Sequence, residues 1–479
     1  MTQKILLISP SSVVDDRFGS SINMRSMSPP LGLLYVAAAL QEEGHAVEVL
    51  DMNGEPDLNG DELSKRLRSS QPDVIGMSTL APAFRDVADT ASLCKEEFPD
   101  CPTVIGGYSA TFNHDRILAK YDCFDYVVRG EGEGTAVELI AQLEKGVPDF
   151  SGVRGLTYKE NGHIRVNEDR PLLKDLDTLP FPAYELVSHL KYGAFGGLRI
   201  ARGSLGSILT SRGCPYTCTF CSCSAFMQAT IRWRSPERVV DELEYVSDHF
   251  GLNEFAVVDD IFTLNKEHVL RICEGIRERG LDLEWYCEGR VNQADEGMYR
   301  EMARAGCRAI FLGIESCVNR ILRYYRKGLT YEMAREAVVK AQRAGMDVVG
   351  SFILGAPIET LEEMWQTVWR AAKLDLDFAD FNVLRITRGM PLWETLVKEG
   401  TLDDGRWEDA IAGFDVNPGV VAEDTSELLE QFHRAFYLRR SFLLRQVLRS
   451  VFRRNKQVML NVSHLRRFVR ELKDLIHLP

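Results

Sequence analysis

The sequence predicts an α/β chain: a doubly wound N-terminal domain, a partial barrel of six strand–helix units, and a C-terminal helical region. Two observations favour this class. Short apolar segments alternate with amphipathic helical patterns along most of the 479 residues. The apolar segments are continuous, which is typical of parallel sheets that helices cover on both faces. We place the boundaries at residues 1–150, 151–200 (a linker), 201–390 and 391–479.

The first domain has five candidate strands with helical patterns between them. In doubly wound sheets, ligands bind outside the carboxyl ends of the strands, so the residues that follow each strand are candidate binding residues. The segment Asp175–Pro182 has two prolines and no hydrophobic period, which indicates a linker. The candidate strands are Lys4–Ser9, Ala46–Leu50, Val74–Ser78, Thr103–Ile105 and Tyr126–Val128.

The second domain repeats the alternation six times. Six units, where a closed barrel has eight, predict an open barrel with its active site at the carboxyl ends of the strands. The candidate strands are Ser207–Thr210, Glu254–Val258, Leu283–Cys287, Cys307–Leu312, Asp347–Ile353 and Phe378–Leu384.

Composition restricts the class of protein. The chain is 45% hydrophobic and 27% charged, as globular proteins are. Its net charge of −13 argues against nucleic acid as the main partner. The apolar segment Leu31–Leu40 is shorter than the ~18 residues of a transmembrane span. We therefore expect a cytoplasmic protein without a transmembrane span, whose 11 cysteines are ligands or buried thiols rather than disulfides.

The C-terminal segment differs in charge from the rest. Residues 431–479 contain twelve Lys or Arg and two Asp or Glu, a net charge of +10, which leaves about −23 for the remainder. A basic amphipathic segment can dock an acidic partner or a membrane surface. It can equally be a solvated helical face that packs against the acidic body.

The strongest chemical signal is a cysteine motif directly after a predicted strand. Cys214, Cys218 and Cys221 have the spacing C-x3-C-x2-C. Structural zinc sites prefer four ligands, whereas three thiolates in one short loop match an iron–sulfur cluster with one open iron. Cys223 falls outside the spacing and is left out of the predicted ligand set. The alternative is three ordinary buried thiols.

With this motif, the segment from about 200 to 390 resembles the radical S-adenosylmethionine (SAM) superfamily. The resemblance implies a 4Fe-4S cluster whose open iron binds SAM, and cleavage of SAM to methionine and a 5′-deoxyadenosyl radical. It also implies an external electron donor of the ferredoxin or flavodoxin type. Ordinary strand-end polarity is the alternative for most of the further SAM-binding residues it implies. These are Phe220, Asp259, Arg290, Glu315, Ser316 and Ile353.

The first domain resembles the cobalamin-binding domain of cobalamin-dependent radical SAM enzymes, on segments such as Val104–Gly107 and Gly130–Glu133. Glycines at strand ends let a bulky cofactor approach the backbone closely. The cobalt-ligand motif D-x-H-x-x-G of other cobalamin proteins is absent, so Tyr108 is a candidate catalytic residue facing the lower side of cobalt. The alternative is that Tyr108 packs on the corrin. The cofactor-binding residues that the resemblance implies are Ser78, Thr79, Gly106, Gly107, Tyr108, Gly130 and Glu131.

The resemblance implies an enzyme that methylates an unactivated carbon. One SAM would methylate cob(I)alamin, and a second would supply the radical. The substrate we expect is a protein side chain such as glutamine or arginine, as in the protein C-methylases that act on methyl-coenzyme M reductase. The alternatives are lipid, tetrapyrrole and natural-product substrates. One alternative is a non-methylating member such as an oxidative cyclase, and another is a cobalamin-binding or redox-sensing protein. Cys94, Cys101 and Cys123 do not have the spacing of a second cluster.

Overall fold

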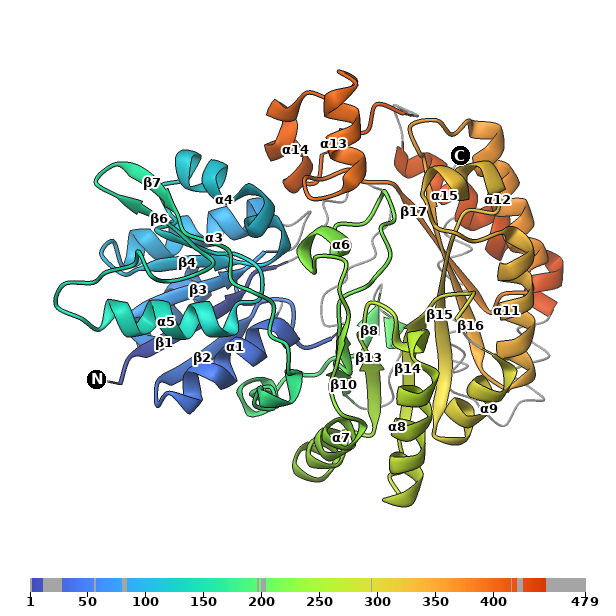
Figure 1. Cartoon of the computed structure of the whole chain (residues 1–479), viewed down its shortest axis with the longest axis horizontal. Coiled ribbons are helices and arrows are strands. Elements are labelled where there is room, and N and C mark those ends of the chain that lie inside the picture. The colour runs from blue at the N-terminus through green and yellow to red at the C-terminus, as the bar shows by residue number, and fades with distance from the viewer. Residues whose placement is uncertain are drawn as a thin grey trace.

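The computed structural model describes residues 2–11, 28–55, 57–79, 84–195, 198–199, 204–293, 295–414, 416–419 and 425–444. In this part of the chain, two domains built on largely parallel sheets lie side by side, and C-terminal helices lie against both of them (Figure 1). The predicted fold class is confirmed. No helix among these residues is long and apolar enough to cross a membrane.

The first domain contains a seven-stranded sheet in the order β2-β1-β3-β4-β5-β6-β7. Strands β1 to β5 are parallel, and β6 and β7 add antiparallel at the edge. The bounds are β1 Lys4–Ser9, β2 Ala46–Asp51, β3 Val74–Ser78, β4 Thr103–Gly106, β5 Tyr126–Val128, β6 Leu156–Glu160 and β7 His163–Val166.

The two edge strands correct one predicted boundary. The segment 151–200 was expected to be a linker, but β6 and β7 within it extend the first sheet. Asn161 and Gly162 join them with φ of 50° and 78°. An Asn-Gly pair between two short strands is a strong hairpin signal, because both residues adopt positive φ readily.

Helices cover both faces of the first sheet, as alternate residues of β1 show. Ile5 and Leu7 pack in the same hydrophobic core as α1 and α5. Leu6 and Ile8 pack on the opposite face with α2, α3 and α4. The bounds are α1 Leu31–Glu42, α2 Gly60–Ser70, α3 Phe84–Glu97, α4 Tyr108–Lys120 and α5 Glu133–Leu143.

The second domain is a six-stranded sheet in the order β10-β13-β14-β15-β16-β17, and all neighbouring strands are parallel. The strands follow chain order and the two end strands do not pair, so the predicted open barrel is confirmed. The strands are β10 Leu205–Ile208, β13 Glu254–Val257, β14 Glu284–Gly289, β15 Cys307–Glu315, β16 Asp347–Leu354 and β17 Phe378–Val383. Helices that connect them are α7 Pro236–Phe250, α8 Lys266–Glu278, α9 Glu296–Arg304, α11 Tyr331–Arg343 and α12 Leu361–Lys373.

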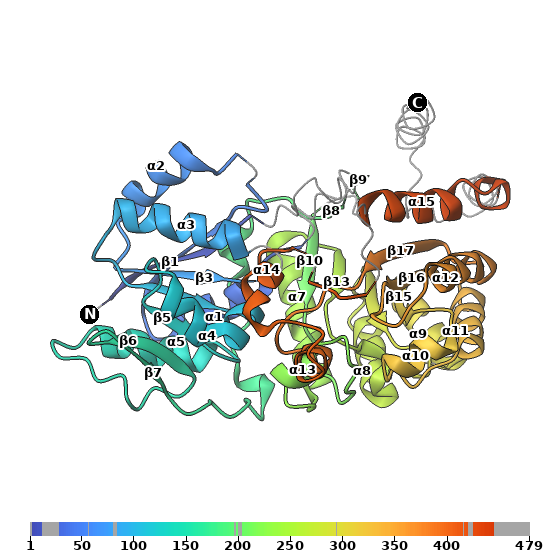
Figure 2. The same cartoon turned by 90° about the horizontal axis from the view of Figure 1, so that it is seen from above.

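The free edge of β17 is covered by α15 (Thr425–Tyr437), which runs alongside it (Figure 2). The Tyr437 hydroxyl donates to the Ala379 carbonyl at 2.7 Å and accepts from the Ala379 amide at 3.1 Å. An open strand edge presents unpaired backbone groups, so this side chain replaces a missing neighbouring strand. Most of the basic segment 431–479 lies outside the described residues, and its role stays a prediction.

Two further C-terminal helices connect the domains. Trp393 of α13 (Pro391–Lys398) and Trp407 of α14 (Trp407–Ile411) enter the hydrophobic core of the first domain. Arg116 pairs with Asp404, and Lys120 of α4 pairs with Glu408. The expected C-terminal region 391–479 therefore divides into a part that joins the domains and a part that covers the barrel edge.

Candidate functional site

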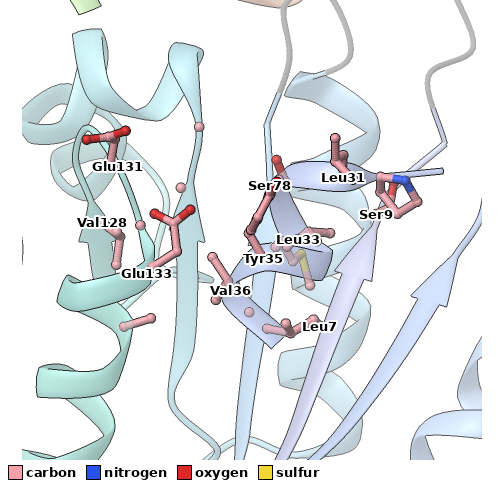
Figure 3. A pocket seen from close by; sticks show the side chains of 18 of the residues that line it. Leu7, Ser9, Leu31, Leu33, Tyr35, Val36, Ser78, Val128, Glu131 and Glu133 are labelled. Atoms are coloured by element: carbon pink, nitrogen blue, oxygen red, sulfur yellow. The ribbon is translucent and has the colours of Figure 1, made fainter. Parts of the chain in front are cut away.

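A cavity of about 710 Å³ extends from the first domain to the edge of the barrel. Its inner part lies between the first sheet and helices α1 and α5. Its outer part is lined by both domains, with Tyr108 on one side and Phe226 and Asp260 on the other. Figure 3 shows Leu7, Leu33 and Val36 turned toward this space. The apolar residues of the inner part include Leu7, Leu33, Val36, Val104, Leu139 and Ile140.

Glycines at two strand ends open the cavity. Gly107, after β4, has a φ of 99°, and a Cβ there would stand 2.5 Å from the Thr79 carbonyl oxygen. Gly130, after β5, has a φ of 71°, and a Cβ there would meet no atom within 4 Å. Gly106 also lines the cavity. Because these positions have no side chain, a bulky ligand can approach the backbone closely.

Of three predicted cobalamin-binding residues with polar side chains, two line the cavity and one does not. Ser78 and Glu131 line it. Thr79 is fully buried, and its hydroxyl accepts a hydrogen bond from the Ala110 amide at 3.1 Å. The Thr79 side chain thus supports the start of α4 and is not part of the cavity lining, and its role in cofactor binding stays a prediction.

Tyr108, the first residue of α4, lies between the two domains. Its ring stacks on Phe226 with 4.0 Å between the ring centroids. Burial and the nearby Asp260 raise the pKa of its hydroxyl, so the oxygen stays protonated at neutral pH. The described residues that line the cavity include no histidine. Whether Tyr108 faces the lower side of cobalt stays a prediction.

The predicted cluster cysteines lie on one loop of the barrel domain. The two-residue strands β11 (Ser211–Arg212) and β12 (Arg232–Trp233) pair at its base, and the short α6 (Cys223–Phe226) follows Cys221. The thiols of Cys214, Cys218 and Cys221 are close enough that the charges of the other two raise the pKa of Cys221.

Burial is the main cause that raises the pKa of Cys221 to about 11. A cation is therefore required to hold this group as a thiolate, and a coordinating metal does so. In a 4Fe-4S cluster the cysteine thiolates are the ligands of the irons. The three thiols on one loop thus fit an iron–sulfur cluster.

Three further predicted residues surround this loop. The Arg290 guanidinium lies 3.8 Å from the Tyr216 ring centroid, and its Nη1 lies 3.8 Å from Cys218 Sγ. Glu315 forms a buried ion pair of 2.6 Å with Lys327. The Lys327 ammonium stands 5.6 Å from the Phe220 ring centroid. The fold thus brings Phe220, Arg290 and Glu315 together beside the cysteines.

Two predicted SAM-binding side chains are enclosed by protein. Asp259 is 1% exposed and accepts from the Thr210 amide at 2.7 Å and the Ser211 hydroxyl at 2.7 Å. These bonds also explain why β10 ends at Ile208, two residues before the predicted end. Ser316 is fully buried, and its hydroxyl bonds with Thr367. The hydrogen bonds of both side chains therefore stabilise the barrel domain. Ile353 is half-buried, and its carbonyl accepts from the Tyr325 hydroxyl at 3.3 Å.

The structure adds several side chains to the site residues that were predicted individually. Asp260, next to Asp259, lines the cavity and accepts from the Gly213 amide at 3.1 Å. Arg212 and Glu133 also line it and pair at 2.6 Å. Arg212 stands just before the cysteine motif, and Glu133 ends the Gly130–Glu133 segment that carries the cobalamin-binding resemblance. Lys327 lies in no motif that the sequence indicated, and its ion pair with Glu315 is what assigns it to the site.

Comparisons with known proteins agree with this geometry. The B12 binding domain family matches residues 22–140, and the Radical SAM superfamily matches residues 208–369. The chain is similar to the uncharacterized methyltransferase PH0819 of Pyrococcus horikoshii, with 36% identity over 93% of this chain and 94% of that one. It is 27% identical to the anaerobic magnesium-protoporphyrin IX monomethyl ester cyclase of Rubrivivax gelatinosus, over 87% of this chain and 75% of that one.

Among solved structures, the radical SAM methyltransferase TsrM of Kitasatospora setae, with cobalamin and a 4Fe-4S cluster bound, has the same fold. The TM-score is 0.70 at 19% identity, over 91% of this chain and 89% of that chain. The apolar cavity with its bare glycines fits cobalamin, and the three-cysteine loop fits the cluster. The chain therefore belongs to the cobalamin-dependent radical SAM methyltransferase family, as an enzyme whose cofactors are cobalamin, a 4Fe-4S cluster and SAM.

Proposed function

We propose that this enzyme transfers a methyl group from cobalamin to an unactivated carbon of its substrate. One observation carries the proposal: the cobalamin cavity continues to Phe226, Met227 and Asp260 of the barrel domain, beside the cysteine loop. A cofactor in this cavity would face the SAM site. This arrangement suits methyl transfer between the two, and it is not needed by a protein that only stores or senses cobalamin.

Each group of residues has a separate task in this proposal. When bound, cobalamin carries the methyl group, and the cluster with SAM supplies the radical chemistry. Cys214, Cys218 and Cys221 hold the cluster. The glycines at the strand ends admit the corrin, and the apolar inner cavity encloses its tail. Arg290 covers the cysteine loop from the barrel side and places a positive charge beside the thiolates.

The substrate and reductant that we propose are those predicted from the sequence. The substrate is a protein side chain such as glutamine or arginine. The electron donor is an external protein of the ferredoxin or flavodoxin type. The charge of the C-terminal segment supports a protein substrate, since residues 431–479 carry a net +10 that would attract an acidic partner.

Isotope labelling tests methyl transfer directly. The reconstituted enzyme is incubated with SAM that carries a deuterated methyl group, a reductant and an extract of the producing organism. We expect a product with three deuteriums, with one S-adenosylhomocysteine and one 5′-deoxyadenosine formed per product. Separate large and small molecular fractions of the extract distinguish a protein substrate from a metabolite. Label found only in the small fraction would overturn the protein substrate and retain methyl transfer.

A second candidate is ring formation without methylation, which the similarity to the magnesium-protoporphyrin IX monomethyl ester cyclase favours. This reaction would produce 5′-deoxyadenosine without a matching amount of S-adenosylhomocysteine, and no deuterium would enter the substrate. That outcome, observed with a converted substrate, would overturn methyl transfer. The family, fold and cofactors would be unaffected.

A further inference from the structure

The loop that carries the cluster cysteines has a charged base. Strand β11 precedes the loop and β12 follows it, and in their antiparallel pairing Arg212 lies opposite Arg232. Like charges directly opposite each other on paired strands are destabilising. This short ribbon therefore requires negative charge beside it.

The first domain supplies that negative charge. Glu131 joins both arginines, with Oε1 3.0 Å from Arg212 Nη1 and Oε2 2.8 Å from Arg232 Nη1. Glu133 Oε1 lies 2.6 Å from Arg212 Nη2. Each of the four side chains is at most 11% exposed. Burial favours the neutral form of Glu131, but the Arg232 hydrogen bond and the Arg212 charge outweigh it and lower its pKa.

The same turn lines the cobalamin cavity. Gly130, Glu131, Gly132 and Glu133 all contribute to the lining, as does Arg212. Figure 3 shows the two glutamates on the turn after β5, across the pocket from Ser9 and Leu31. One short turn thus lines the cofactor cavity and also forms ion pairs with the base of the cysteine loop.

We propose that Glu131 and Glu133 are positioning residues that set the place of the cysteine loop relative to cobalamin. Buried ion pairs add little net stability, because the cost of desolvation offsets their attraction. The geometry that the four charges impose is the better explanation for them. Placement matters for the reaction, since a shift of ~1 Å in reacting groups can slow an enzyme by about a hundredfold.

The test is Glu131→Gln in the holoenzyme, which keeps the shape of the side chain and removes its charge. Electron paramagnetic resonance measures how the reduced cluster speeds the relaxation of cob(II)alamin, which depends on the distance between them. This readout needs no substrate, so its outcome is independent of the proposed function. With cobalamin supplied in excess so that the cavity is filled, we expect an altered relaxation at unchanged iron content. The ratio of 5′-deoxyadenosine to S-adenosylhomocysteine formed in turnover should change on the order of tenfold.

Two further variants make the test specific. Glu133→Gln should have a smaller effect of the same kind, because among the described residues Glu133 pairs with Arg212, whereas Glu131 pairs with both arginines. Glu408→Gln is the control. Its ion pair with Lys120 also joins the first domain to a later part of the chain, helix α14, but Glu408 does not line the cavity. It should leave the relaxation unchanged.

Normal relaxation in Glu131→Gln with full cofactors would overturn the proposal. An equal change in Glu408→Gln would also overturn it, because any loosening of the interface would then suffice. If Glu131→Gln does not fold, Glu133→Gln decides by the same criterion.

Discussion

Two regions of the molecule each bring three cysteines together, and they have opposite uses. Cys94, Cys101 and Cys123 lie in the hydrophobic core of the first domain, each at most 9% exposed. Cys214, Cys218 and Cys221 lie on a loop at the mouth of the barrel. In both regions burial raises the pKa of thiols, to about 12 for Cys94 and about 11 for Cys221.

The difference lies in what surrounds the sulfur atoms. The first set sits among apolar side chains on separate elements, and Cys101 Sγ lies 3.6 Å from the Pro72 carbonyl. The second set shares one loop, beside the Arg290 guanidinium and next to a cavity. Thiol burial by itself therefore does not identify a ligand. A shared loop with cationic neighbours and open space does.

The largest expected effect comes from the loop cysteines. Replacing Cys214, Cys218 and Cys221 by alanine should abolish cluster binding, because no other thiol group of the loop has the required spacing. The anaerobically reconstituted wild type should hold about four irons, and the variant almost none. Iron and sulfide assays with the visible absorbance measure this. Replacing Cys94, Cys101 and Cys123 is the matched control and should leave the iron content unchanged.

The next largest effect is expected at a glycine of the cavity. Gly107→Ala adds a Cβ where φ is 99° and the Thr79 carbonyl oxygen would be 2.5 Å away. Equilibrium binding of cobalamin should weaken severely, because the backbone at the cavity must shift. Gly44→Ala is the control: it also places a side chain at a positive φ, 85°, at a cost of about 1–2 kcal/mol, but a Cβ there meets no atom within 4 Å. It should lower stability and retain cobalamin. Equal loss of cobalamin in both variants would refute the assigned site.

A spectroscopic effect is expected at Tyr108. Tyr108→Phe removes one oxygen and keeps the ring that stacks on Phe226. If the oxygen faces cobalt, the electron paramagnetic resonance spectrum of bound cob(II)alamin should change while cobalamin affinity changes little. An identical spectrum would show that Tyr108 only packs against the cofactor or the loop.

The smallest effect is expected in the core of the first domain. Cys94→Ala removes one fully buried sulfur atom and leaves a small cavity. The free energy of unfolding should fall by about 1 kcal/mol, as a thermal or denaturant melt would measure. Iron and cobalamin contents should not change. A loss of iron in this single variant would contradict the distinction between the two regions.

Local sequence determined most of the elements. Continuous apolar segments such as Lys4–Ser9 could be predicted as strands from their own residues. A strand of a parallel sheet is buried on both faces, and its sequence is therefore apolar throughout. The cysteine spacing is local too, since one loop provides all three predicted ligands. The hairpin at Asn161 and Gly162 was equally readable, because its signal is two adjacent residues.

Only the tertiary structure decided which polar side chains face the site. Successive residues at a strand end point in different directions, so Asp259 binds Thr210 and Ser211 while Asp260 lines the cavity. Glu131 meets Arg212, which is 81 positions away, because two separately folded domains dock there. Hydrophobic period and motif spacing act over a few residues, whereas the partner of a buried charge depends on how the domains pack.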